Sequence, residues 1–597
     1  MRPTSFTFDK KSIRYRHALK TITKFLRSHI FLIIITMAVC SYFYGLLANW
    51  NGTYFDADGY MHALRVHHLL LAPSFAEQPI LESNYPFGEY LHWTRPMDAL
   101  WLLFTLPFWS LDNIKDVIFL SGTFIAPVLG VLTAIVLAYG LRRQFSVYLV
   151  ILGCTILFLN PAANDYFMPL RPDHHALMIM LAVYASSLVL CWMKKRQNRY
   201  LRLLGIILAL MTFTAIEGIL LYAIFLCFFL YLYTYKNVSL LPAVKTSKYF
   251  AIALTVFWFI NPPHEGWFFP DNGRISVLYV VISWLSFIGF WILNVSHLHT
   301  AKIKLLSLLC MALGFSLSLI VIFGLNVFDT PIDEGIKAIL TDRMTELSAI
   351  KDLTLSQIIA YYIFPMLALA VNLWLFFKRP YKRLMILNLC LGVPLFFLSL
   401  IAVRFCMYQP LYVILPFVAW VDYLYKTSDF FKNKKLQFPG YLWGVSFLIL
   451  IVEQLLTYPW TFENQKAKTE LTFSHELCQQ IKNISGTLVT DIFLSPQYVW
   501  SCDVNTVGTP YHHNVQGILD NHALLNEEFP SKMIPLLLKH QVTQILLFED
   551  YDKNYYSENT ENQNKLYYRL IKRQNVPPFL TEVKTPLPNA RLYEVKI

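Results

Sequence analysis

Long apolar runs separated by short basic loops dominate this chain of 597 residues. Hydrophobic residues make up 56% of the sequence, and the mean hydropathy is +0.45. Many of the runs reach or approach the roughly 20 residues that an α-helix needs to cross a bilayer, which excludes a soluble protein. We therefore predict a multi-pass α-helical membrane protein with about 13 transmembrane helices.

The predicted spans follow these apolar runs along the chain. As a single helix, the run 203–235 would be about 50 Å long, whereas the apolar core of a bilayer is about 30 Å thick. Because basic residues bound this run at both ends, we predict two helices that meet near Ile216-Glu217-Gly218. Residues 99–112 are too short to span and are predicted to lie in the interface or to re-enter. The other spans are predicted at about 30–47, 117–140, 146–160, 176–193, 249–261, 275–294, 305–326, 355–377, 384–403, 408–425 and 441–459.

The distribution of Lys and Arg predicts the orientation. Loops on the side of the N-terminus hold 28 of these residues, and loops on the opposite side hold nine. This bias places the basic segment 1–28 in the cytoplasm and makes the first span a signal anchor. We predict a cytoplasmic membrane protein whose C-terminal domain lies outside, in a bacterial periplasm. The net charge of +12 belongs to this pattern, so no nucleic acid is expected as a partner.

Three regions follow from this topology. Residues 29–459 form the predicted transmembrane domain, and residues 460–597 form a predicted extracytoplasmic α/β domain with alternating apolar strands near 486–493 and 542–549. Cys478 and Cys502 fall in this second domain and could pair if it lies outside the cytoplasm; sequence does not give their separation. The outer loops of the transmembrane domain are 48–116, 160–175 and 327–354.

Acidic and imidazole side chains recur in the predicted outer loops. The first loop contains Tyr54-Phe-Asp-Ala-Asp-Gly-Tyr-Met-His62, and the second contains Arg171-Pro-Asp-His-His175. Carboxylates and imidazoles together suit a divalent cation such as Mn²⁺, with Mg²⁺ less favoured by imidazole. We predict Asp58, Asp173 and His175 as ligands, with Asp56 as the alternative to Asp58.

Transfer of a sugar from a lipid phosphate would need further groups. A cation or an Arg must take up the charge on the leaving phosphate, and an acid must orient or deprotonate the acceptor. Arg404 and Glu346 are the predicted residues for these two roles. Glu217 interrupts an apolar run, where an acid is costly unless it is paired or lines a cavity. The predicted donor-binding residues are Arg404, Arg171, Arg95, His62, Tyr408 and Glu217.

These motifs resemble those of the GT-C class of membrane glycosyltransferases, most closely the catalytic subunit of oligosaccharyltransferase. Asp58-Gly-Tyr-Met-His62 resembles the first-loop acidic motif of that family, and Asp173-His174-His175 resembles its second motif. Thr345-Glu346 is similar to the family's short Glu motif, and Arg404 to its lipid-phosphate Arg. The resemblance covers the topology of the whole chain, and it implies thirteen helices, a polyprenyl-linked sugar donor and contact with membrane lipid.

The sequence also departs from the family. It contains no Trp-Trp-Asp-Tyr-Gly motif, and its nearest dense polar segment, Gly508-Thr-Pro-Tyr-His-His-Asn514, differs in kind. This segment is explained equally well as a site or as a loop that packs on the membrane domain. The acceptor is therefore left open as a protein, a lipid or a glycan.

The sequence leaves other function classes open. One is a transferase that uses a single sugar on a polyprenyl monophosphate and acts on a lipid or an envelope glycan. A transporter or flippase is the non-enzyme alternative, although transport favours polar groups at mid-membrane and repeated halves, which the sequence does not display. A structural membrane subunit is a third alternative, but it would give the outer acids no purpose.

Overall fold

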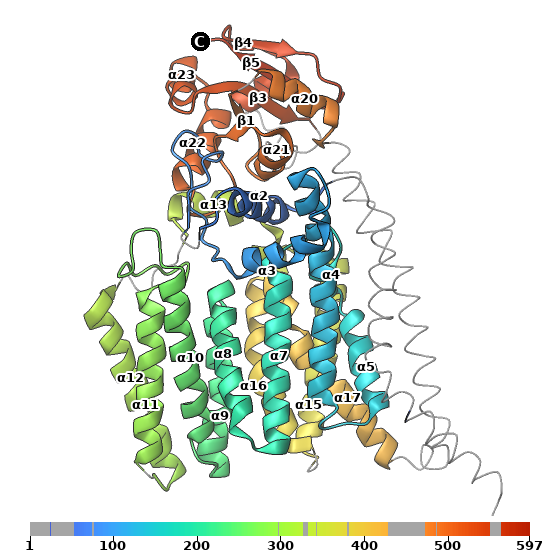
Figure 1. The fold of residues 1–597 in the computed structure, drawn as a ribbon, viewed down its shortest axis with the longest axis vertical. Helices are drawn as coiled ribbons and strands as arrows, with labels where there is room; N and C mark the ends of the chain where they lie inside the picture. The colour runs from blue at the N-terminus through green and yellow to red at the C-terminus, as the bar shows by residue number, and fades with distance from the viewer. Residues whose placement is uncertain are drawn as a thin grey trace, which may run out of the picture.

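A computed structural model describes the chain in ten ranges: 24, 53–74, 77–296, 298–325, 332–341, 343–378, 381–427, 472–484, 486–549 and 563–597. The predicted spans at 30–47 and 441–459 lie outside these ranges, as does almost all of segment 1–28. The described residues form a bundle of helices that is capped at one end by an α/β domain (Figure 1).

Nine helices among the described residues are long and apolar enough to cross a membrane. A tenth span results if the bent pair Val147–Phe158 and Pro161–Phe167, with a 68° bend, is counted as one. These helices confirm the multi-pass helical fold. The nine are α4 (Ile114–Leu141), α7 (His174–Lys195), α9 (Gly218–Lys236), α10 (Leu241–Ile260), α11 (Val277–Val295), α12 (Ala301–Phe323), the segment Leu355–Phe376 that ends in α15 (Phe364–Phe376), α16 (Lys382–Ile401), and Val403–Thr427 with α17 (Pro410–Thr427).

The long apolar run divides as predicted. Helix α8 (Asn198–Thr214) ends where Ala215 takes an extended conformation, with φ −149° and ψ 141°, and α9 begins at Gly218. Glu217 therefore lies in the turn between two helices. The short apolar segment before α4 forms α3 (Pro96–Thr105) and a 3-10 turn (Leu106–Phe108), which is shorter than a span.

Small residues allow close helix packing inside the bundle. A Cβ atom at Gly205 of α8 would lie 2.4 Å from the carbonyl oxygen of Thr246 in α10. Only glycine permits this approach, which is how helices gain van der Waals contact in a bilayer, where lipid tails are as apolar as the helices themselves.

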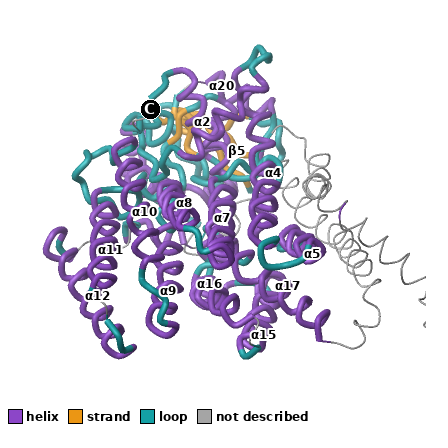
Figure 2. Tube along the Cα trace, turned by 60° about the horizontal axis from the view of Figure 1, so that its bottom comes forward, coloured by secondary structure: helices purple, strands orange, loops and turns teal. Residues whose placement is uncertain are grey.

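The C-terminal domain is built on a mixed sheet of five strands in the order β2-β1-β3-β5-β4. Strands β1, β2 and β3 are parallel, whereas β5 runs antiparallel to both β3 and β4. Figure 2 shows these strands gathered in one place, with helices making up most of the rest. The strands are β1 (Thr487–Val489), β2 (Asn505–Thr506), β3 (Val542–Phe548), β4 (Leu580–Val583) and β5 (Ala590–Val595); the helices are α20 (His475–Ile484), α21 (Ser495–Cys502), α22 (Val515–Asn526), α23 (Pro530–Lys539) and α24 (Leu566–Lys572).

Two helices of the predicted outer loops lie between the bundle and the sheet (Figure 1). Helix α2 (Ala57–Leu71) packs against α21, and α13 (Glu334–Thr341) packs against α22. Within the domain, Cys478 and Cys502 form a disulfide with their Cα atoms 5.2 Å apart. The question that the sequence left open is thus answered in favour of pairing.

Candidate active site

The N-terminal ends of α2 and α7 carry the acidic motifs. Asp173 is the N-cap of α7, and its carboxylate accepts a hydrogen bond from the backbone N–H of His175 at 3.1 Å. Capping by Asp is favoured because its oxygen satisfies a free N–H of the first turn. The cap places His174 and His175 in that same first turn, so a single helix end presents a carboxylate and two imidazoles.

Glycine brings the two helix ends together. A Cβ atom at Gly59 would lie 3.2 Å from Cδ of Pro172 and 3.2 Å from Cβ of Tyr54. A larger residue would therefore push α2 away from the segment that precedes α7. Gly59 directly follows Asp58, so this close approach positions the Asp58 carboxylate beside Asp173.

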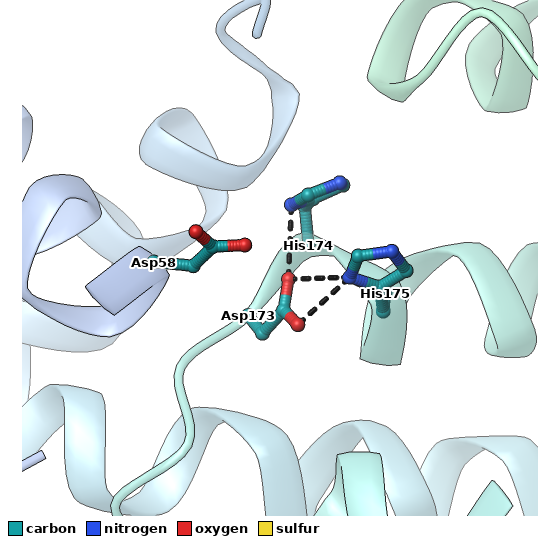
Figure 3. A group of neighbouring side chains, drawn as sticks. All are labelled: Asp58, Asp173, His174 and His175. Atoms are coloured by element: carbon teal, nitrogen blue, oxygen red, sulfur yellow. Dashed lines mark hydrogen bonds and ion pairs between the residues drawn. The ribbon is translucent and has the colours of Figure 1, made fainter. Parts of the chain in front are cut away.

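Asp58, Asp173, His174 and His175 form one cluster (Figure 3). One ligating atom from each residue lies within 4.8 Å of the others. Oδ2 of Asp173 is 2.7 Å from Nδ1 of His175, and Oδ1 of Asp173 is 2.9 Å from Nδ1 of His174. In Figure 3 the Asp58 carboxylate faces these three side chains from the other helix.

The electrostatic environment of Asp58 favours a nearby positive charge. Burial raises the pKa of Asp58 well above its ordinary value, and the neighbouring carboxylates of Asp173 and Asp56 raise it further. Burial would also raise the pKa of Asp173, but the imidazoles of His175 and His174 bring it well below the ordinary value. A positive charge between the helix ends would remove the repulsion that Asp58 experiences.

The donor set fits a divalent metal ion. Two neighbouring ligands of an octahedral ion at about 2.1 Å are about 3 Å apart, close to the spacing between Asp173 and the two imidazoles. Two carboxylates with imidazole suit Mn²⁺ or Zn²⁺ better than Mg²⁺.

Asp56 takes a different place from Asp58. Its Oδ1 accepts from the N–H of Gly59 at 2.9 Å, and its Oδ2 pairs with Nε of Arg171 at 3.0 Å. The Arg171 guanidinium also pairs with Asp165 and, through Nη2 at 3.3 Å, with Oε1 of Glu346. Asp56 is therefore a cap and an ion-pair partner, outside the four-residue cluster, and Arg171 connects it to the loop that carries Glu346.

A second charged group consists of Glu217, which follows α8, and of Arg404 and Tyr408, which precede α17. Nη2 of Arg404 is 2.7 Å from Oε2 of Glu217, and the Tyr408 hydroxyl donates to Oε1 of Glu217 at 3.2 Å. Arg404 lowers the pKa of Glu217 against the effect of burial. These three predicted residues lie together, and Glu217 holds the guanidinium in place.

Two other predicted donor-binding residues lie in a buried network. Nδ1 of His62 is 2.9 Å from Oδ1 of Asp98, and both side chains are fully buried. Nη1 of Arg95 pairs with Oδ2 of the same carboxylate at 3.3 Å, as does Nη2 of Arg65 at 2.7 Å. These contacts hold the first outer loop together. Neither His62 nor Arg95 lines the cavity described next.

A cavity of about 190 Å³ opens on the cluster. Its wall includes Asp58, His174 and His175 together with Glu217, Arg404 and Glu346. Trp93 and Thr94 from the first outer loop and Tyr511 and His512 from the C-terminal domain complete the polar wall, and Ile332, Leu340, Met344 and Leu347 form an apolar side. One space thus joins residues from distant parts of the sequence.

Tyr511 and His174 belong to the cluster or contact it, although the sequence did not predict either as a site residue. The Tyr511 hydroxyl donates to Oδ1 of Asp58 at 3.2 Å, and its ring packs edge-on against Trp93 with centroids 4.8 Å apart. The segment Gly508–Asn514 therefore packs on the membrane domain and also reaches the cluster. In the sequence, this segment is notable for its density of Tyr and His residues. That density alone does not indicate that Tyr511 contacts Asp58.

Comparison with solved structures identifies the fold. The archaeal oligosaccharyltransferase AglB from Archaeoglobus fulgidus, in complex with an inhibitory peptide and a dolichol-phosphate, aligns with a TM-score of 0.68 at 12% identity, over 92% of this chain and 78% of that chain. The same organism's enzyme tethered to an acceptor peptide with the NVT sequon gives 0.65 at 14% identity, over 91% and 71%. Its complex with Zn and sulfate gives 0.60 at 14% identity, over 88% and 69%.

The chain thus has the fold of the GT-C membrane glycosyltransferases, and among them it is similar to archaeal oligosaccharyltransferase. No family model matches the sequence, and no curated protein matches it.

Proposed function

We propose that this chain is a metal-dependent glycosyltransferase that moves a sugar or oligosaccharide from a polyprenyl (pyro)phosphate to an acceptor outside the cytoplasmic membrane. The observation that carries the proposal is the cluster of Asp58, Asp173, His174 and His175 at the wall of a cavity that also contains Arg404 and Glu346. The fold shared with an oligosaccharyltransferase supports it.

The roles follow from charge and position. When bound, a divalent ion in the cluster would offset charge on the leaving phosphate. Arg404, oriented by Glu217, would hold the same phosphate through its guanidinium. Glu346 accepts hydrogen bonds from Tyr166 at 3.2 Å and Arg171 at 3.3 Å, which holds its carboxylate at the cavity to orient the nucleophile of the acceptor.

The disulfide supports the proposed location. Disulfides persist in oxidising compartments and are rare in the cytosol. Together with the bias of basic residues, the pair Cys478–Cys502 therefore supports our proposal that the C-terminal domain lies in the periplasm.

The test is sugar transfer by the purified protein in nanodiscs. Lipid-linked glycans extracted from the source membrane serve as donors, and a total membrane protein and lipid fraction serves as acceptor. We expect labelled glycan to move to the acceptor with Mn²⁺, and both chelation and Asp58→Ala to abolish this transfer. Transfer that persists after both changes would contradict metal dependence, and its absence from the wild type would contradict the enzyme proposal.

A further inference from the structure

Two histidines that are not part of the acidic cluster form a wall of the same cavity. His92 comes from the first outer loop and His512 from the C-terminal domain, and their ring centroids are 4.2 Å apart. Both rings line the cavity. The ring of His513 packs against that of His512, with the two centroids 4.6 Å apart.

One ring nitrogen of His92 and one of His512 lack a polar partner in the described part of the chain. Nδ1 of His92 and Nε2 of His512 are buried without a hydrogen bond. A buried polar atom that stays unpaired costs free energy. We therefore expect a ligand that forms hydrogen bonds with these two rings.

The backbone leaves space beside this pair. A Cβ atom at Gly273 would lie 3.2 Å from Nε2 of His512 and 3.4 Å from Nε2 of His513. Gly273 also lines the cavity. Any larger side chain at this position would therefore press on the imidazoles.

The wall is electrically neutral. Burial lowers the pKa of His512 to about 3, and it lowers the pKa of His92 well below its ordinary value. The nearby cations, Arg404 and Arg274, are already paired with Glu217 and Glu77. Neutral imidazoles each offer one donor and one acceptor, which matches hydroxyl groups better than phosphate.

The position of the wall suggests which part of a substrate it contacts. Trp93 packs against residues of both groups, because its ring centroid lies 5.3 Å from that of His174 and 5.3 Å from that of His92. A sugar bonded to a phosphate at the metal cluster would extend along Trp93 towards the histidines. We propose that His92, His512 and the space at Gly273 form the subsite for the sugar that the donor lipid carries.

This subsite rests on the proposed function, and a binding experiment separates the two. The full-length protein is titrated with lipid-linked glycans extracted from the source membrane, and with the same extract after mild acid has removed the glycans. We expect the wild type to bind the intact lipids more tightly. His92→Phe and His512→Phe each reduce this preference about fivefold, the effect of one neutral hydrogen bond, and leave affinity for the stripped lipids unchanged.

Two further variants keep the test decisive if a histidine variant misfolds. Gly273→Val fills the space without removing a polar group and is expected to reduce the same preference. His522→Phe, on the exposed side of α22, is the control and is expected to change neither affinity.

Three results would overturn the subsite. They are equal wild-type affinity for the two extracts, an unchanged preference in all three cavity variants, or equal loss of both affinities. Failure of the stripped lipids to bind the wild type would instead contradict the proposed function, and the subsite with it.

Discussion

The hydroxyl of Tyr511 donates to Oδ1 of Asp58 at 3.2 Å, and 453 positions of sequence separate these two residues. The C-terminal domain thus orients a carboxylate that the first outer loop presents to the cavity. Partners of metal ligands commonly change metal affinity or activity 10–100-fold when removed.

We expect Tyr511→Phe to weaken Mn²⁺ binding about tenfold, because the Asp58 carboxylate loses the donor that fixes its orientation. Isothermal titration of the purified protein measures this. Tyr593→Phe is the matched control, since it also removes one buried hydroxyl of the same domain, which donates to the carbonyl of Leu570 at 2.7 Å. Equal affinities in the two variants would contradict a role for Tyr511 at the cluster.

Arg404→Ala should reduce kcat/KM for the lipid donor at least 100-fold, because it removes the cation that we propose holds the phosphate. Glu217→Gln should reduce kcat/KM about tenfold, since it retains the guanidinium of Arg404 and removes only the negative charge that orients it. Steady-state transfer rates at varied donor concentration check both. The exposed pair partner Arg573 provides the control substitution, Arg573→Ala. A larger effect from Glu217→Gln than from Arg404→Ala would reverse the proposed roles.

Glu89 should make the contact between the first outer loop and the C-terminal domain depend on pH. Burial raises its pKa from an ordinary 4.5 to about 7, although Thr509, Ser83 and Asn514 form hydrogen bonds that lower it. The folded protein holds this proton up to about pH 7, whereas the unfolded chain releases it near pH 4.5. The contribution of Glu89 is therefore most favourable below pH 4.5 and declines by about 3 kcal/mol as the pH rises through 7.

Glu89→Gln keeps the hydrogen-bonding shape and removes the titration. We expect the variant to gain stability relative to the wild type as the pH rises from 5 to 8. Thermal unfolding of both proteins across that range gives the difference. A difference that stays constant with pH would show that Glu89 does not titrate in this window.

The disulfide gives a test of location. If the C-terminal domain is periplasmic, the peptide with Cys478 should resist alkylation in intact cells until a reductant is added. Mass spectrometry of alkylated peptides measures this. Cys478→Ser with Cys502→Ser should also destabilise the domain by about 2–4 kcal/mol. Alkylation of Cys478 without reductant would place the domain in the cytoplasm.

The fold could largely be predicted from the sequence because bilayer thickness limits apolar runs so strictly. The break at Glu217 is an example: a run too long for one span had to divide, and the acid indicated where. The mixed order of the C-terminal sheet could not be predicted, since strand pairing depends on contacts between distant segments.

The candidate site could also be predicted only in part. Asp58, Asp173 and His175 belong to short motifs whose residue types indicate metal binding, and they lie close together in the structure. Asp56 shows what the sequence could not predict. It has the same side chain as Asp58 and lies two positions away, and only the structure shows that it pairs with Arg171. Tyr511, His92 and His512 carry no motif, because their proximity arises only when the two domains pack together.

The most direct test of the central claim is a titration of Mn²⁺ into the purified wild-type protein, Asp58→Ala and Asp173→Ala, followed by the electron paramagnetic resonance signal of free Mn²⁺. Asp56→Asn distinguishes the cap from the ligand, and the exposed Asp112→Ala is the control. We expect one bound ion in the wild type and in Asp112→Ala, weakened binding in Asp56→Asn, and no binding in Asp58→Ala or Asp173→Ala. Equal binding in the wild type and both of those variants, or no binding in the wild type, would contradict a metal centre between the two helix ends.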